Sequence, residues 1–290
     1  MNDRSPAFYI LAAVFALYVL FLYGPMLAIF VLSFQGPSGG LTFPMNDVSL
    51  HWFNKLYEGN GIVDLGSAFR RSLALGVIVM AVTVVFSVAA GLAFRKKFRG
   101  SSILFYTAVA SLIVPSIVTS LGIALEFRLG DDLIRNYLFD WWETGMGLFT
   151  SGLGAHLTWT LPFGLLIMFA VFNRFDHRLE EAARDLGATP WQTFWHVVLP
   201  IILPSVIGIG LFGFTLSWDE LARSSQAIGP VNTLPLELQG LTTTVTNPDI
   251  YALGTAISAV SFIVIAACLG FVFWLQKRRA RLGSDAGKGV

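Results

Sequence analysis

Long apolar runs without charged residues recur along the chain. An α-helix needs about 20 such residues to cross the ~30 Å hydrocarbon core of a bilayer. The runs do not alternate apolar with polar residues, and they are too long for the strands of a membrane barrel. The pattern therefore predicts an all-α integral membrane protein with six transmembrane helices, at approximately 8–34, 69–94, 101–125, 150–172, 200–220 and 251–276.

The fifth run, Pro200–Trp218, is close to the lower length limit for a span. Composition supports the membrane class, since 55% of residues are hydrophobic, 13% are charged and the mean hydropathy is +0.68. Soluble domains carry roughly 25% charged residues. The first run is about twice as long as the apolar region of a secretory signal, so we expect an uncleaved span. A single transmembrane domain over 1–290 is expected, and the lone Cys268 excludes an internal disulfide.

The distribution of basic residues predicts the orientation. Most of the 19 Lys and Arg residues lie in the two termini and in the connections 95–100 and 173–199. The positive-inside rule places these segments in the cytoplasm, with both termini. The opposite connections carry Trp52, Phe53 and Tyr57 as interfacial anchors, and an amphipathic pattern over Glu126–Glu143 that predicts a helix at the outer surface. That helix is either a cap over the spans or a docking surface for a periplasmic partner.

The connection 173–199 is predicted to form a helical hairpin. Its first helix has one apolar face, and Gly187 is placed to end that helix in the left-handed conformation. The second helix begins with a capping box, in which a proline takes the first helical position. The residues that carry this pattern are Asp176 as the first cap, Leu179, Ala182, Ala183 and Leu186 on the apolar face, and Thr189, Pro190 and Gln192 in the capping box. The pattern alone leaves a structural hairpin and a docking element equally open.

The same loop resembles the EAA loop of binding-protein-dependent ABC importer permeases. The matching positions are Glu181-Ala182-Ala183, Gly187, Val197 and Leu199-Pro200, with Val197 where the family usually has isoleucine. The resemblance implies the type I ABC importer permease fold and a loop that docks onto an ATPase subunit. It also implies the docking residues, which are Glu181, Ala182, Ala183, Asp185, Gly187, Leu199 and Pro200.

The second half of the chain is similar to the second permease of spermidine/putrescine importers. The similarity is carried by His156, Leu161-Pro162-Phe163, Phe214–Glu220, Ser224-Ser225, Gly229-Pro230 and Leu234-Pro235-Leu236. It implies a bacterial inner-membrane importer subunit whose partners are a homologous permease, two ATP-binding subunits, a periplasmic substrate-binding protein and membrane lipid, with no nucleic acid. ATP and Mg would be bound by the ATPase subunits, and this chain would need no cofactor.

The chemistry visible in the sequence agrees with a non-catalytic subunit. A phosphate-binding G-x-x-x-x-G-K-[ST] stretch, a Gly-x-Ser-x-Gly elbow and a His-Glu-x-x-His motif do not occur in it. The four histidines lack the spacing of metal ligands, so no metal site is expected. An intramembrane enzyme and a passive pore subunit are the alternatives, and neither accounts for the EAA-like loop.

Four residues are candidates for the substrate pathway, namely His156, Trp218, Asp219 and Glu220. The adjacent carboxylates could concentrate a cationic substrate, which favours polyamines. Arg223, one turn onward, works against a purely cationic pathway and keeps an anionic or zwitterionic substrate open. Pro115, Pro162 and Pro204 interrupt predicted spans, either to permit rocking in alternating access or as static kinks.

Overall fold

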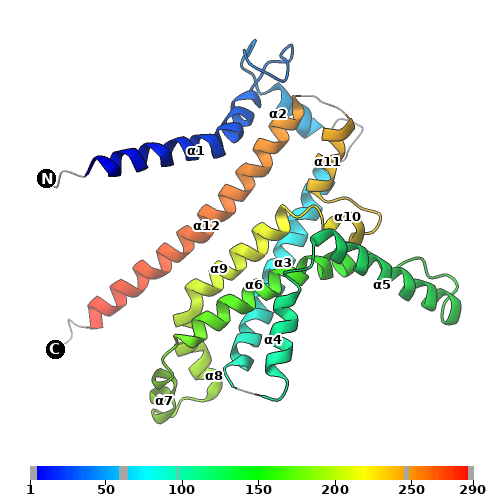
Figure 1. The fold of residues 1–290 in the computed structure, drawn as a ribbon. Coiled ribbons are helices and arrows are strands. Elements are labelled where there is room, and N and C mark those ends of the chain that lie inside the picture. The colour runs from blue at the N-terminus through cyan, green and yellow to red at the C-terminus, as the bar shows by residue number, and fades with distance from the viewer. Residues whose placement is uncertain (1–4, 59–64, 97, 245–247, 287–290) are drawn as a thin grey trace. The chain divides into compact units, whose positions relative to one another are not determined.

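The computed structural model describes residues 5–58, 65–96, 98–244 and 248–286, and these residues are helical apart from their connections and one isolated bridge between Gln35 and Val48 (Figure 1). The all-α prediction is confirmed. In chain order the elements are α1 (Pro6–Leu32), α2 (His51–Glu58), α3 (Leu65–Phe94), α4 (Ser101–Ala110), α5 (Ser116–Tyr137), η1 (Leu148–Gly152), α6 (Leu153–Asn173), α7 (Arg178–Asp185), α8 (Pro190–Thr193), η2 (Phe194–Val198), α9 (Leu199–Trp218), α10 (Ser224–Ala227), α11 (Leu234–Thr244) and α12 (Asp249–Ala286).

Five helical stretches are long and apolar enough to cross a membrane within the described parts of the chain. They are Pro6–Leu32, Leu65–Phe94, Leu148–Asn173, Pro190–Trp218 and Asp249–Phe271. They correspond to the first, second, fourth, fifth and sixth predicted spans. The fifth is longer than its apolar run, because α8, the π-helical turn η2 and α9 follow one another without a break for 29 residues.

The segment predicted as the third span, 101–125, differs from one continuous helix. α4 ends at Ala110, and α5 begins at Ser116 after a turn that ends on Pro115. Proline lacks an N–H and crowds the preceding turn, so it favours a helix start over a helix interior. The Ser111 hydroxyl donates a hydrogen bond to the Thr158 carbonyl (2.6 Å), which fixes the turn against α6. α5 then runs through the amphipathic segment predicted at Glu126–Glu143 as far as Tyr137.

The chain divides into two compact units. The first comprises Met1–Gly66 with Glu237–Phe262, and the second comprises Ser67–Leu236 with Ile263–Val290. Inside the first unit, the Tyr251 hydroxyl donates to the Leu41 carbonyl (2.8 Å), and Lys55 lies 3.9 Å from the Asp249 carboxylate. These contacts hold the 35–50 connection and α2 to the start of α12.

The second unit is built on α3, α6 and α9, which lie side by side (Figure 1). Its largest apolar cluster joins α6 to α9 and consists of Met168, Phe172, Phe175, Val198, Ile202, Val206 and Ile209. α3 approaches α6 so closely at Gly91 that a Cβ there would lie 2.7 Å from the Met168 Cβ. Small residues permit such close helix packing in membranes. A buried hydrogen bond between the Thr83 and Thr160 hydroxyls (2.9 Å) adds to the same contact.

Candidate functional site

The loop 173–199 folds into two short helices, as the sequence predicts, but the N-cap of α7 is His177 and not the predicted Asp176. The Arg178 N–H donates to Asp176 Oδ1 (3.0 Å) at the start of α7. Gly187 ends the helix with a φ of 86°, a conformation that glycine adopts without steric cost. At the start of α8, the Gln192 N–H donates to Thr189 Oγ1 and the Thr189 N–H donates to Gln192 Oε1. The predicted capping box is therefore confirmed.

The two adjacent glutamates of α7 lie in different surroundings. Glu180 is buried, whereas Glu181 is exposed. Ala182 and Asp185 share the exposed side, and Leu186 next to them is 90% exposed. Two members of the predicted apolar face, Ala182 and Leu186, thus point outward, whereas Leu179 on the same face is 45% exposed. Of the other predicted docking residues, Ala183 is half-buried on α7, Gly187 is exposed, and Leu199 and Pro200 are half-buried at the start of α9.

Glu180 is the centre of an ionic group that ties α7 to the end of α3. Its Oε1 lies 2.7 Å from an Arg95 nitrogen, and its Oε2 lies 3.6 Å from Arg184. Arg95 also donates to His177 Nδ1 (2.5 Å) and covers the ring of Phe172. Sequence reasoning used Arg95 only as a topology signal, and it missed this group because the pairing joins segments far apart in the chain.

A second polar group is buried where α6, α9 and α10 meet. His156 has no exposed surface, and its Nδ1 and Nε2 lie 2.8 Å from Ser217 Oγ and 2.9 Å from Ser224 Oγ. The Ser224 hydroxyl in turn donates to the Glu220 carbonyl (2.8 Å). Both ring nitrogens are therefore occupied by hydroxyl groups, so the side chain of His156 joins three helices in this conformation.

Arg223 is the cation of this group and is only 2% exposed. Its Nε donates to Thr158 Oγ1 (3.0 Å), its Nη1 donates to Ser116 Oγ (2.6 Å), and its guanidinium lies 4.7 Å from the ring of Trp159. Glu220 accepts the Arg223 N–H (2.8 Å) and forms a 4.0 Å ion pair with the guanidinium. Burial lowers the pKa of Arg223, and the charge of Glu220 opposes that shift.

The four predicted pathway residues therefore lie in different surroundings. His156 and Glu220 are buried in the polar group, and Trp218 is buried against Phe214, with ring centroids 5.7 Å apart. Asp219 is exposed, at the end of α9. Of the two adjacent carboxylates, only that of Asp219 is free to meet a solute in this conformation.

Asp131 holds the segment after α5. Its carboxylate accepts hydrogen bonds from Trp142 Nε1 (2.8 Å), Thr144 Oγ1 (2.6 Å) and the Gly145 N–H (2.6 Å). Burial acts to raise the pKa of Asp131, but these hydrogen bonds, with the charge of Arg135, bring the pKa below its ordinary value. The sequence pattern placed Asp131 among the surface charges of an amphipathic helix, because its partners lie beyond the helix end.

Residues 83–281 match the family of binding-protein-dependent transport system inner membrane components. The chain belongs to this family. It is 31% identical over 263 residues to the putrescine transport system permease protein PotI of Escherichia coli (strain K12), covering 90% of this chain and 88% of that protein. It is 27% identical over 250 residues to the spermidine/putrescine transport system permease protein PotC of the same strain, covering 85% and 88%.

Solved structures agree on the fold. A bacterial ABC transporter involved in the import of the acidic polysaccharide alginate superposes with a TM-score of 0.63 at 18% identity, covering 94% of this chain and 98% of that one. The inward-facing MetNI methionine ABC transporter gives 0.55 at 16% identity, covering 73% and 95%. The predicted importer permease fold is thus confirmed. The family is the non-catalytic, multi-pass inner-membrane component of ABC importers, which confirms that the chain is a permease subunit and not an enzyme.

Proposed function

We propose that this permease subunit forms half of the translocation pathway of a polyamine importer, and that α7 transmits the work of the ATPase. The observation that carries the proposal is the outward apolar face of α7, with Leu186 90% exposed beside Ala182. Burying a leucine side chain stabilises a complex by about 1.5–3 kcal/mol. An exposed leucine on a rigidly capped loop is therefore suited to a partner surface.

The inward side of α7 explains how movement of the loop would reach the spans. Glu180 binds Arg95 at the end of α3, and the chain continues from Gly187 through α8 and η2 directly into α9. Displacement of α7 by a closing ATPase dimer would therefore act on α3 through the ion pair and on α9 through the backbone. Loop movement of this kind fits alternating access by rigid-body rocking.

The proposed assembly follows from the family. Two ATP-binding subunits, which hold ATP and Mg, a homologous permease and a periplasmic substrate-binding protein would complete the importer, with both termini of this chain in the cytoplasm. The docking residues would be Glu181, Ala182, Asp185 and Gly187 on the exposed side of the loop and the half-buried Ala183, with Leu199 and Pro200 at the start of α9.

A polyamine substrate is supported by two independent observations. The permeases that match over most of this chain are named for putrescine and for spermidine/putrescine transport. In addition, Arg223 is buried and paired with Glu220, so it does not place a free positive charge beside the exposed carboxylate of Asp219. The charge of Arg223 therefore does not favour an anionic solute in this conformation.

The proposal is tested by reconstituting the chain with its cognate subunits and measuring ATP-dependent uptake of putrescine, spermidine and an anionic solute of similar size. Leu186→Asp should abolish both capture of the ATPase subunit and polyamine uptake. Leu186→Met keeps an apolar contact and should retain both. Uptake of the anionic solute in preference to polyamines would refute the substrate, and full ATPase capture by Leu186→Asp would refute the docking face.

A further inference from the structure

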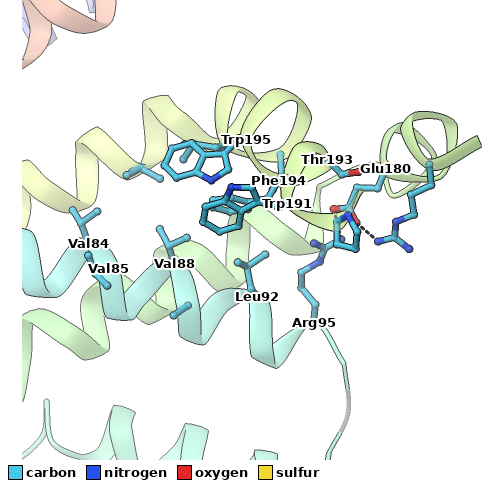
Figure 2. Close-up of a pocket in the computed structure, with 16 residues that line it drawn as sticks. Val84, Val85, Val88, Leu92, Arg95, Glu180, Trp191, Thr193, Phe194 and Trp195 are labelled. Carbon is cyan, nitrogen blue, oxygen red and sulfur yellow. Dashed lines mark ion pairs between the residues drawn. The ribbon is translucent and has the colours of Figure 1, made fainter. Parts of the chain in front are cut away.

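An apolar groove of about 710 Å³ lies between the second half of α3 and the α8–η2–α9 segment. Figure 2 shows its two walls, with Val84, Val88 and Leu92 on α3 facing the rings of Trp191, Phe194 and Trp195. The exposed face of α7 around Leu186 and the buried polar group around His156 lie outside this groove, whereas Leu199 and the Arg95–Glu180 pair line it. It is large enough for an extended hydrocarbon ligand, since sites for small molecules commonly measure 300–1,000 Å³.

The length of the groove matches one leaflet of a bilayer. Val84 at one end and Arg95 at the other are eleven residues apart along α3 and its C-terminus. At 1.5 Å per residue this separation is about 16 Å. The hydrocarbon core is ~30 Å thick, so the α3 wall of the groove spans about half of it, and on the opposite wall the same length separates Trp195 from Val206. A helix from another protein would follow the whole span, whereas an acyl chain ends at mid-bilayer.

The end of the groove nearest α7 carries charge. Arg95, Arg184 and Glu180 line it, which leaves one surplus positive charge after the carboxylate is counted. Arg95 is held by Glu180 at 2.7 Å, whereas Arg184 lies 3.6 Å from the same carboxylate and its side chain is 57% exposed. Arginine presents several N–H donors in a planar fork that matches a phosphate group, so Arg184 has donors to offer an anionic headgroup.

The aromatic residues mark the level of the membrane surface. Trp191 is 69% exposed, Trp195 is exposed beside it, and their rings lie 5.4 Å apart. Tryptophan concentrates at the boundary between hydrocarbon and headgroups because its ring is apolar and its N–H is polar. Basic pockets between transmembrane helices at this level suit anionic lipid headgroups.

We propose that this groove binds an anionic phospholipid from the leaflet that borders the 173–199 loop. One acyl chain lies between the α3 valines and the indole rings, and the phosphate is bound by Arg184. The site requires only that the chain is inserted in a membrane, and it depends neither on the polyamine substrate nor on docking of the ATPase.

The test uses the full-length chain, purified in mild detergent and exchanged into nanodiscs of mixed phosphatidylglycerol and phosphatidylethanolamine. Lipids retained after extraction back into detergent are counted by native mass spectrometry. The wild-type chain should retain phosphatidylglycerol over phosphatidylethanolamine by about fivefold, the effect expected of one basic residue near a headgroup. Arg184→Gln should lose this preference, whereas Arg178→Gln, an exposed residue of the same loop outside the groove, should keep it.

A second pair of variants tests the acyl-chain part of the site. Val85 lines the groove and is exposed, so Val85→Trp fills the space without disturbing the core, and it should lower retention of both lipids. Val77 is also exposed on α3 but lies outside the groove, so Val77→Trp should leave retention of both lipids unchanged. Equal retention of the two lipids by the wild-type chain, or unchanged retention by Val85→Trp, would overturn the proposal.

Two further outcomes would reassign the groove. Loss of the lipid preference in excess inorganic phosphate would show that Arg184 binds free phosphate instead of a headgroup. A wild-type dimer in light scattering that Val85→Trp converts to monomer, with lipid retention unchanged, would show that the groove seats a second copy of the chain.

Discussion

Arg95 and Glu180 form a 2.7 Å ion pair that joins the C-terminus of α3 to the first turn of α7. The two side chains are 14% and 10% exposed, so the pair is largely shielded from solvent. Removing one partner of a shielded pair leaves an uncompensated charge, which costs more than the pair itself contributes. The pair therefore makes the inward side of α7 a fixed joint, while the outward side is free for docking.

Glu180→Gln should weaken the coupling of ATP hydrolysis to transport and leave capture of the ATPase subunit intact, because Glu180 faces inward. Polyamine uptake per ATP hydrolysed in proteoliposomes is the measurement. Glu181→Gln is the matched control on the outward side, and it should reduce ATPase capture instead. Reversed effects of the two variants would contradict the assignment of the two glutamates to opposite sides.

The stability of the same joint can be measured by a double-mutant cycle. Arg95→Gln and Glu180→Gln should each lower the thermal midpoint of the purified chain, and the double variant should be less destabilised than the sum of the two. Residues in direct contact commonly show coupling of about 0.5–3 kcal/mol. Additive effects of the two substitutions would show that the contact between Arg95 and Glu180 contributes no coupling energy to stability.

His156→Ala should destabilise the second unit by about 1–3 kcal/mol, because the Ser217 and Ser224 hydroxyls lose their buried partner. Chemical unfolding of the purified chain measures the change. The control is Thr242→Ala, because Thr242 lies on an exposed part of α11. Thr158→Val is unsuitable as a control, since Thr158 accepts a hydrogen bond from Arg223. Unchanged stability with a raised KM for putrescine would instead assign His156 to the substrate pathway.

Asp131→Asn should expose the segment after α5 to proteases, because a neutral amide cannot accept all the hydrogen bonds that the carboxylate accepts from Trp142, Thr144 and Gly145. The pKa of Asp131 is lower in the folded chain than its ordinary value of 3.8. Its stabilising contribution is therefore complete above about pH 4 and is lost as the pH falls through the folded-state pKa.

Limited proteolysis across this range of pH is the measurement for Asp131. Wild type should resist cleavage at neutral pH and lose that advantage over Asp131→Asn only in strong acid. Asp132→Asn is the matched control, since the neighbouring carboxylate is 63% exposed and pairs only loosely with Arg135 (3.5 Å). A protective effect of Asp131 that disappeared near neutral pH would contradict the lowered pKa.

Gly91→Leu should destabilise the packing of α3 on α6 by about 1–3 kcal/mol or more, because its side chain meets the Met168 Cβ and the Phe172 ring. Gly208→Ala is the control, since no atom lies within 4 Å of the added Cβ. Alanine there should stabilise α9 by up to about 1 kcal/mol. Thermal midpoints of the two purified variants should therefore move in opposite directions.

Hydropathy predicted five of the spans, because a membrane requires apolar length regardless of packing partners. The helical hairpin 173–199 could also be predicted, since the hydrogen bonds of Asp176, Thr189 and Gln192 are local in sequence and these residue types are typical of helix starts. The 101–125 segment was harder, because its apolar run continues through the turn and only Pro115 marks the break. The pairs Arg95–Glu180 and His156–Ser217 could not be predicted, since they join residues brought together only by the packing of α3, α6, α7 and α9.

The helical stretch from Pro190 to Trp218 connects the two sides of the membrane. Its 29 residues measure about 43 Å at 1.5 Å per residue, which exceeds the ~30 Å hydrocarbon core, so its two ends protrude on opposite sides. Thr189 and Asp219 therefore lie at the two ends of one continuous helical stretch, which contains the π-helical turn η2 and Pro204. A displacement of the capping box therefore reaches the exposed carboxylate of Asp219 along a single backbone, with η2 and Pro204 as the places where that backbone can bend.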